Sequence, residues 1–128
     1  MAFKHVKQVI STANSLVTLY TVPTGKEFVL FNKRACSWNI ATDATATVTF
    51  YNGSTSIGAL TVENTNGGAV NTTAATDEVV DGSNYTKTVF SAGTVLKAKT
   101  SVANTMAEII GLELDAGTWT NVNQSNIQ

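Results

Sequence analysis

Few residues in this sequence are of types that carry chemistry. The chain has one histidine, His5, and one cysteine, Cys36. A catalytic histidine needs a nucleophile or an orienting carboxylate, and no residue near His5 in the sequence provides either. The charge of Arg34 could lower the pKa of the Cys36 thiol, but the apolar strand around this cysteine favours a buried, inert thiol. A single cysteine allows no disulfide within the chain, and structural zinc is not expected.

Oxygen ligands cluster at one place, the segment DEVVDGSN at residues 77–84. These carboxylates could bind Ca²⁺, but their spacing does not match a loop in which the ligands alternate, so we expect an Asp-Gly turn instead. Glu108 and Glu113 fall on opposite faces of one predicted strand, which excludes a glycosidase pair. We therefore expect no catalytic residue, no metal and no cofactor.

Four aromatic residues could bind a sugar through their ring faces, namely Trp38, Tyr51, Tyr85 and Trp119. Aromatic side chains in a β domain more often belong to its core or to an interface. A carbohydrate-binding module therefore stays open as an alternative.

The composition is that of one folded domain with little charge. The chain has 128 residues, of which 43% are hydrophobic and 13% charged, about half the usual charged share. Threonine occurs at 21 positions. A surface of hydroxyl groups suits exposed strands, and it also suits a protein partly covered by its own copies or by a partner.

The charges do not favour nucleic acid or a membrane as a partner. The net charge is −1, and the densest basic groups are the pairs Lys4/Lys7 and Lys33/Arg34, which we expect at solvated edges. Nucleic-acid binding needs a larger basic cluster. The apolar run near the N-terminus is too short for a signal peptide, and no segment is apolar enough to span a membrane.

Periodicity in the sequence predicts strands rather than helices. The clearest alternation is at residues 45–51, where three threonines fall on one face and Ala46, Val48 and Phe50 on the other. One wet and one buried face is typical of an antiparallel sheet. Asn52-Gly53 follows directly and predicts a hairpin to a strand at residues 56–62.

Further strands are expected along the whole chain. They are predicted at residues 5–10, 14–22, 27–31 with a bent continuation through 36–40, 86–90, 95–100 and 106–114. One face of the last strand carries Met106, Glu108, Ile110, Leu112 and Leu114. Gly111 within it indicates a bulge or a close backbone approach. Residues 63–77, with two adjacent glycines, are predicted to form a long polar loop.

These elements predict an all-β fold of seven or eight strands in a single antiparallel β-sandwich. A jelly roll is favoured, and an immunoglobulin-like sandwich is the alternative. The sandwich is expected to span residues 1–114. Residues 115–128 are expected to form a polar C-terminal tail that docks on a neighbour through Trp119.

Three motifs then resemble a known group. They are LYTVPTGK at residues 19–26, SAGTVL at residues 91–96 and IGLEL at residues 110–114. Together they resemble small β-sandwich virion proteins of tailed bacteriophages, over residues 16–114. In that group an acidic residue often follows the turn glycine, where this sequence has Thr94. The resemblance implies a head decoration (cement) protein, or a protein associated with the neck, tail or fibre.

Of these, we expect a bacteriophage capsid decoration protein without enzymatic activity. It would bind the outer shell as a multimer, commonly a homotrimer, with the major capsid protein as its partner. Its location would be the virion, assembled in the host cytoplasm. The N-terminal segment 1–10 or the loop 63–77 is expected to face the capsid. The expected partner-binding residues are Phe3, Lys4, His5, Asn66, Gly67, Gly68 and Trp119.

Overall fold

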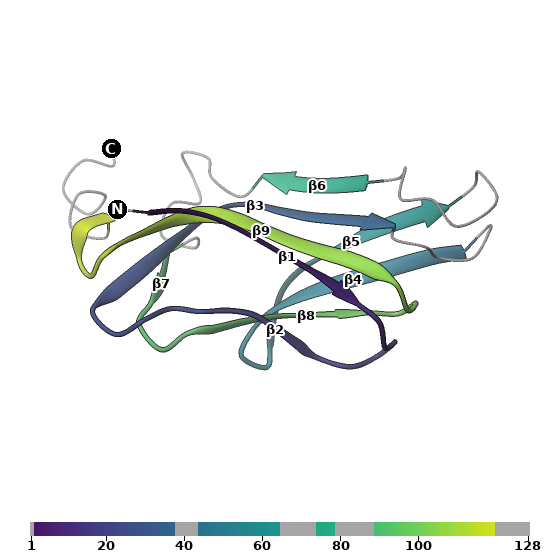
Figure 1. The fold of residues 1–128 in the computed structure, drawn as a ribbon, viewed down its shortest axis with the longest axis horizontal. Helices are drawn as coiled ribbons and strands as arrows, with labels where there is room; N and C mark the ends of the chain where they lie inside the picture. The colour runs from purple at the N-terminus through teal and green to yellow at the C-terminus, as the bar shows by residue number, and fades with distance from the viewer. Residues whose placement is uncertain (1, 38–43, 65–73, 79–88, 120–128) are drawn as a thin grey trace.

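The computed structural model describes residues 2–37, 44–64, 74–78 and 89–119, and every strand in them is antiparallel to its neighbours (Figure 1). The strands are β1 (Ala2–Ile10), β2 (Val17–Thr21), β3 (Lys26–Ser37), β4 (Ala44–Asn52), β5 (Thr55–Asn64), β6 (Ala74–Glu78), β7 (Val89–Ser91), β8 (Val95–Thr100) and β9 (Thr105–Asp115).

The strands form two sheets, which lie as two layers in Figure 1. The first sheet has the order β1-β9-β3-β6, with β7 also paired to β3, and the second has the order β2-β8-β4-β5. The strand β6 pairs with residues 32–36 of β3, and β7 pairs with residues 27–29 along the same edge. The nine strands therefore occupy eight positions, and the predicted antiparallel β-sandwich is confirmed.

The pairing follows the order of a jelly roll. The first strand pairs with the last, β2 with β8, β3 with β6 and β7, and β4 with β5. These four pairings are nested within one another, like a single long hairpin. The additional pairs β3–β9 and β4–β8 join them into the two sheets of the sandwich. The topology decides for the jelly roll over the immunoglobulin-like alternative.

Turn chemistry agrees with the sequence. Gly25 and Gly53 have φ angles of 77° and 62°, values that suit glycine because it has no Cβ. The Lys26 N–H donates to the Pro23 carbonyl oxygen at 3.1 Å and closes the predicted Pro-Gly turn. The hairpin at Asn52-Gly53 joins β4 to β5, as predicted. The predicted continuation of the third strand is confirmed as far as Ser37, with a register shift between Leu30 and Asn32, and residues 38–40 lie outside the described part.

Several predicted boundaries were wrong. The first strand begins at Ala2 rather than residue 5, because β9 pairs with it over its whole length. The predicted loop 63–77 contains the end of β5 and most of β6. Its polar, small residues gave no strand signal; the ladder with β3 supplies the backbone partners instead. The strand expected at residues 86–90 begins at Val89, and residues 86–88 lie outside the described part.

The interior between the sheets is mainly apolar. Its largest fully buried side chains include Phe28, Phe50, Ile10, Leu96 and Ile109. Lys33 also lies inside, at 4% exposure, because its register partner is the core residue Ile109. Its Nζ donates to the Ile57 carbonyl oxygen of the opposite sheet at 2.6 Å. The expectation that Lys33 and Arg34 lie at a solvated edge was wrong, because β3 is paired on both sides.

Gly111 provides the close approach predicted from the sequence. A Cβ at this position would overlap the Val29 carbonyl oxygen and would lie 2.6 Å from Cζ of Phe28. The Phe28 ring is thus packed over the glycine of the neighbouring strand, and its centroid lies 4.8 Å from that of Tyr20. The missing side chain in β9 makes room for an aromatic residue in β3.

We expect Gly111→Ala to destabilise the fold by about 3 kcal/mol or more, since a backbone oxygen cannot move aside as a flexible side chain can. Chemical denaturation followed by fluorescence measures the change. The control is Gly93→Ala, which adds a methyl group in open space at a φ of 87°. It should cost only about 1 kcal/mol, the conformational penalty alone. Equal costs for the two variants would contradict the packing argument.

The carboxylate of Glu113 on β9 joins the two sheets from within the sandwich. Tyr20 Oη donates a short hydrogen bond to Glu113 Oε1, which joins β2 of one sheet to β9 of the other. Burial raises the pKa of Tyr20 above its ordinary value of 10.0, and the hydrogen bond and the charge of Glu113 raise it further. The neutral phenol is therefore the form that the fold stabilises.

The variant Tyr20→Phe should lower the free energy of unfolding by about 1.5 kcal/mol at neutral pH, the scale of a hydrogen bond to a charged group. Because the folded pKa is raised, this contribution is complete below the unfolded value of 10.0 and is lost as the pH rises towards the folded pKa. Thermal unfolding of both proteins at about pH 8 and about pH 11 tests this. A difference that grows with pH would contradict the assignment.

Candidate partner-binding face

The outward side of β9 is its more apolar side. Ala107 and Ile109 point into the sandwich, where they belong to the core cluster. Because side chains alternate along a strand, the apolar residues predicted to share a face, among them Ile110 and Leu112, point away from the sandwich. Met106, Ile110 and Leu112 are half-buried, whereas Leu114 of the same predicted set is buried. A jelly roll normally turns its polar side outward, so this face calls for a partner.

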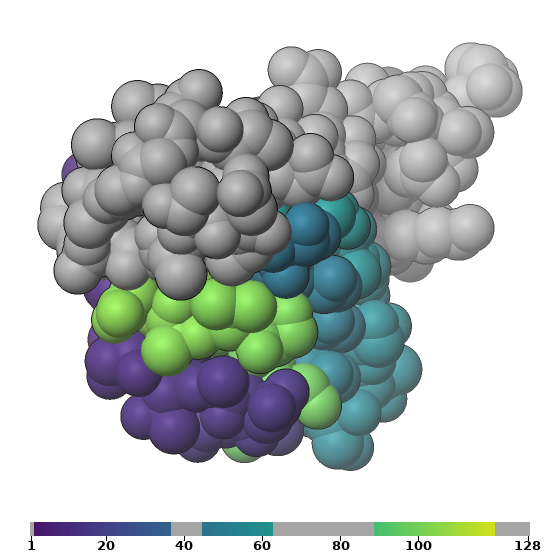
Figure 2. All heavy atoms as spheres, turned by 90° about the vertical axis from the view of Figure 1, so that its right-hand side faces the viewer, coloured from purple at the N-terminus to yellow at the C-terminus, as the bar shows by residue number. Residues whose placement is uncertain are grey.

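The strand β1 extends this apolar side. Phe3 is 67% exposed, the larger value of the two exposed large hydrophobic residues in the described part of the chain. Its register partner is Leu112. Val9 pairs with Met106 in the same way. In the end-on view of Figure 2, N-terminal residues, in purple, lie beside the green C-terminal strands at the margin of the molecule. The β1–β9 face consists of Phe3, His5, Lys7, Val9, Met106, Glu108, Ile110 and Leu112.

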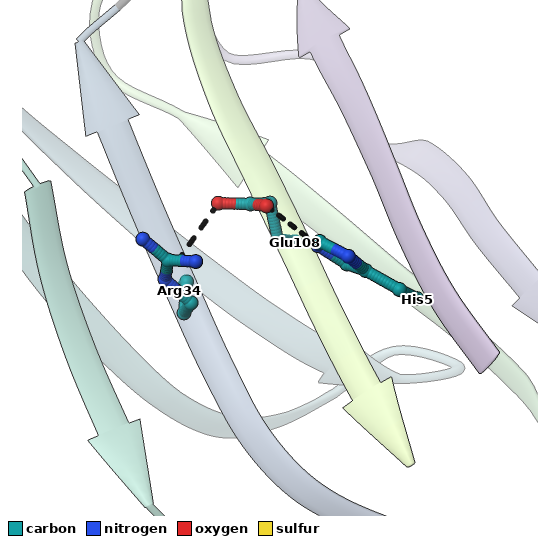
Figure 3. Close-up of polar contacts among 3 residues, drawn as sticks. All are labelled: His5, Arg34 and Glu108. Atoms are coloured by element: carbon teal, nitrogen blue, oxygen red, sulfur yellow. Dashed lines mark hydrogen bonds and ion pairs between the residues drawn. The ribbon is translucent and has the colours of Figure 1, made fainter. Parts of the chain in front are cut away.

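A buried carboxylate lies at the centre of this face (Figure 3). Nε2–H of His5 donates to Glu108 Oε1 at 2.7 Å, and Arg34 Nε lies 3.8 Å from Glu108 Oε2. The Glu108 side chain is 6% exposed. A carboxylate only accepts hydrogen bonds, so the hydrogen bond fixes the imidazole tautomer with a proton on Nε2. Lys7 is the register partner of Glu108 on β1, which places three basic side chains around one acid.

The same carboxylate acts on Cys36 of the neighbouring strand β3. Cys36 is buried, and burial raises the pKa of its thiol. The charge of Glu108 raises this pKa further, and Arg34 lowers it by less. The prediction that Cys36 is buried is confirmed. The expected effect of Arg34 exists, but it is the smallest of the three.

The structure brings together only part of the predicted binding set. Phe3 and His5 lie on the β1–β9 face, whereas Lys4 pairs with Gly111 and lies on the other side of β1. Trp119 follows β9 and is half-buried. Asn66, Gly67 and Gly68 lie outside the described residues.

Sequence reasoning missed the partner of His5. The orienting carboxylate that seemed to be lacking is Glu108, 103 positions away along the chain. The available signal was Glu108 itself, a single acid within an otherwise apolar strand face. A buried acid needs a cation or a donor beside it, so its presence there predicts one without naming it.

No other candidate site assembles in the described part of the chain. Among the described residues there is no group of three or more residues that could hold a metal ion. The acidic segment 77–84 lies largely outside the described residues. Tyr51 is on the second sheet, with Lys99 Nζ 5.6 Å from its ring centroid, while Trp119 follows the first sheet. Trp38 and Tyr85 lie outside the described residues. The described residues contain no helix that is long and apolar enough to cross a membrane.

The strand pairing defines the protein as a jelly-roll β-sandwich. No family model and no curated protein sequence matches it. One similar solved structure is from Bacillus endospore appendages, described as disulfide-linked pili, with 10% identity over 89% of this chain and 87% of that chain at a TM-score of 0.46. Another is the virus-like particle of the extra small virus of the giant freshwater prawn Macrobrachium rosenbergii, with 14% identity over 91% and 79% at 0.45. Scores this low establish neither a shared family nor a function.

We expect Glu108→Gln to lower the pKa of the Cys36 thiol, because the variant removes a negative charge that raises it. The Cβ chemical shift of Cys36, followed by NMR as a function of pH, reports this pKa directly. The matched control, Glu113→Gln, removes the same charge from the inward side of the same strand and should leave the Cys36 pKa unchanged. A thiol that responds equally to both variants would show that Glu108 has no specific role.

Proposed function

We propose that the chain is a structural protein of bacteriophage virions, a decoration protein that binds the outside of the capsid and stabilises it. The observation that carries the proposal is the apolar outward side of β9, which β1 extends to the exposed Phe3. A protein that worked alone would gain nothing from such a face and would risk aggregation. Added to the resemblance of residues 16–114 to phage β-sandwich proteins, it favours a subunit that lies against a larger surface.

We propose that the protein stabilises the shell by binding preferentially to its assembled state. A protein that binds the assembled shell and not its separated subunits stabilises the assembly in proportion to its own occupancy. Binding across the contact between neighbouring capsid subunits would oppose their separation. The proposal includes no enzymatic step and no cofactor. It includes self-association as a homotrimer, since repeated binding to a symmetric shell favours symmetric oligomers.

A neck, tail or fibre location is the alternative within the virion. The copy number per particle separates the two, because a shell offers many equivalent positions and a neck or tail tip offers only a few. A carbohydrate-binding module is not favoured: of its four candidate aromatic residues, the two described ones lie apart, with Tyr51 on β4 of the second sheet and Trp119 after β9 of the first.

Phe3→Ser should weaken binding to shells that lack the protein by about tenfold or more, the scale of one buried aromatic side chain. A substitution is preferable to deletion of residues 1–10, because Ile10 belongs to the core. The control is Leu16→Ser, at the second exposed large hydrophobic residue, with 45% exposure, outside the β1–β9 face. Sedimentation with purified particles, followed by quantification of the bound chain, measures both.

Two results would count against the assignment. If Phe3→Ser and Leu16→Ser bind as well as the original chain, the β1–β9 face does not contact the shell. If the chain is absent from purified virions, the decoration function itself is wrong.

A further inference from the structure

One long strand edge is left without a neighbour. Within the described part of the chain, β1 pairs only with β9, and it does so residue for residue from Ala2 to Ile10 with no register shift. The backbone N–H and C=O groups that do not point at β9 point away from the sheet. A regular edge of this kind can accept a further strand.

The other sheet margins are irregular, as edges in stable proteins usually are. The strand β2 has five residues and a register shift in its pairing with β8. The strand β5 has a register shift near Gly58, whose φ is 136°. The margin opposite β1 is divided between β6 and β7, which residues 79–88 separate. Bulges and short strands hinder the addition of another strand, and β1 has neither.

The charge of β1 restricts what can pair with it. Its sequence AFKHVKQVI contains Lys4, His5 and Lys7 and no acidic residue. Like charges that face each other across a strand pair are destabilising, and lysine on an edge strand is a common defence against self-pairing. A second copy of β1, paired antiparallel over the whole strand, would place Lys7 of each copy opposite His5 of the other, two basic side chains together. An acidic strand would meet no such penalty.

The outward side chains of β1 define the pattern of a complementary strand. His5 and Lys7 are exposed and stand between Phe3 and Val9 on the same side. The carboxylate of Glu108 already pairs with His5 from the β9 side. Lys7 makes no ion pair among the described residues, so its charge is available to a strand on the open side. Carboxylates opposite His5 and Lys7, flanked by apolar residues, fit this edge.

We propose that the outer edge of β1 binds an extended acidic segment of a partner protein, which adds to the sheet as a further strand. Main-chain hydrogen bonds would provide affinity, and Lys7, His5 and Phe3 would select the sequence. The inference rests on the proposed function only for the source of the segment, the capsid protein. The chemistry of the segment follows from β1 itself.

The test uses a synthetic probe, so it does not depend on a capsid. The nine-residue peptide Thr-Val-Thr-Glu-Thr-Glu-Thr-Val-Thr places valines opposite Phe3 and Val9 and glutamates opposite His5 and Lys7, and it reads the same in either direction. Titration into the full chain, followed by NMR backbone amide shifts, should move the amides of β1 first. The same peptide with lysines in place of glutamates should bind with an affinity lower by about fivefold or more, because it makes two unfavourable cross-strand pairs.

A matched pair of variants locates the site. Lys7→Gln should weaken binding of the glutamate peptide about threefold. Lys97→Gln makes the same change in net charge on β8 of the other sheet, where Lys97 pairs with Thr18, and should leave binding unchanged. Any of three results overturns the inference: no shift in β1 at millimolar peptide, equal binding of both peptides, or the largest shifts in β2 or β5.

Self-pairing is tested in the same experiment. Amide shifts of β1 that depend on the concentration of the protein alone would mean that the edge serves a second copy, and they would overturn the acidic segment. If the peptide binds as expected while the chain is absent from purified virions, the edge site stands and the decoration function falls. The two proposals can therefore fail separately.

Discussion

The fold depends on a strand that is paired along both of its edges. The strand β9 lies between β1 and β3, and β3 pairs with it from Thr105 to Asp115 and β1 from Thr105 to Glu113. Two registers then fix the direction of every side chain on it, because a slip of one residue would have to occur in both pairs at once. As a consequence, Ala107, Ile109 and Gly111 must point inward, and the larger Ile110 and Leu112 must point outward.

The small inward residues of β9 set the packing of the core. With glycine at position 111, the ring of Phe28 can lie against the neighbouring strand and contact Tyr20 of the opposite sheet. The volume that β9 leaves is thus filled from β2 and β3. The core therefore does not need the apolar side chains on the outward side of β9. These side chains and Phe3 form the face that we assign to a partner.

Both acids within β9 are held by residues of other strands, one on each side. Glu113 accepts a hydrogen bond from Tyr20 inside the sandwich, and Glu108 accepts one from His5 outside it. Each buried or half-buried carboxylate therefore connects β9 to a strand that is distant in sequence. The outer acid also gives the β1–β9 face a polar centre, which a purely apolar surface would lack. Polar groups of this kind fix the position of a partner more than they add affinity.

The sequence alone determined the elements whose signals are local. Alternation at residues 45–51, the Asn52-Gly53 turn and the glycine within the last strand predicted the strands, a hairpin and a close approach, because each depends on backbone preferences of a few adjacent residues. It did not reveal β6, whose small and polar residues form a strand only beside β3.

Only the tertiary structure decided which side of β9 faces outward, since alternation defines two faces without saying which is buried. It also placed Lys33 inside, joined His5 to Glu108 across 103 positions, and selected the jelly roll. Each of these depends on strand pairing between distant segments, which no local pattern encodes.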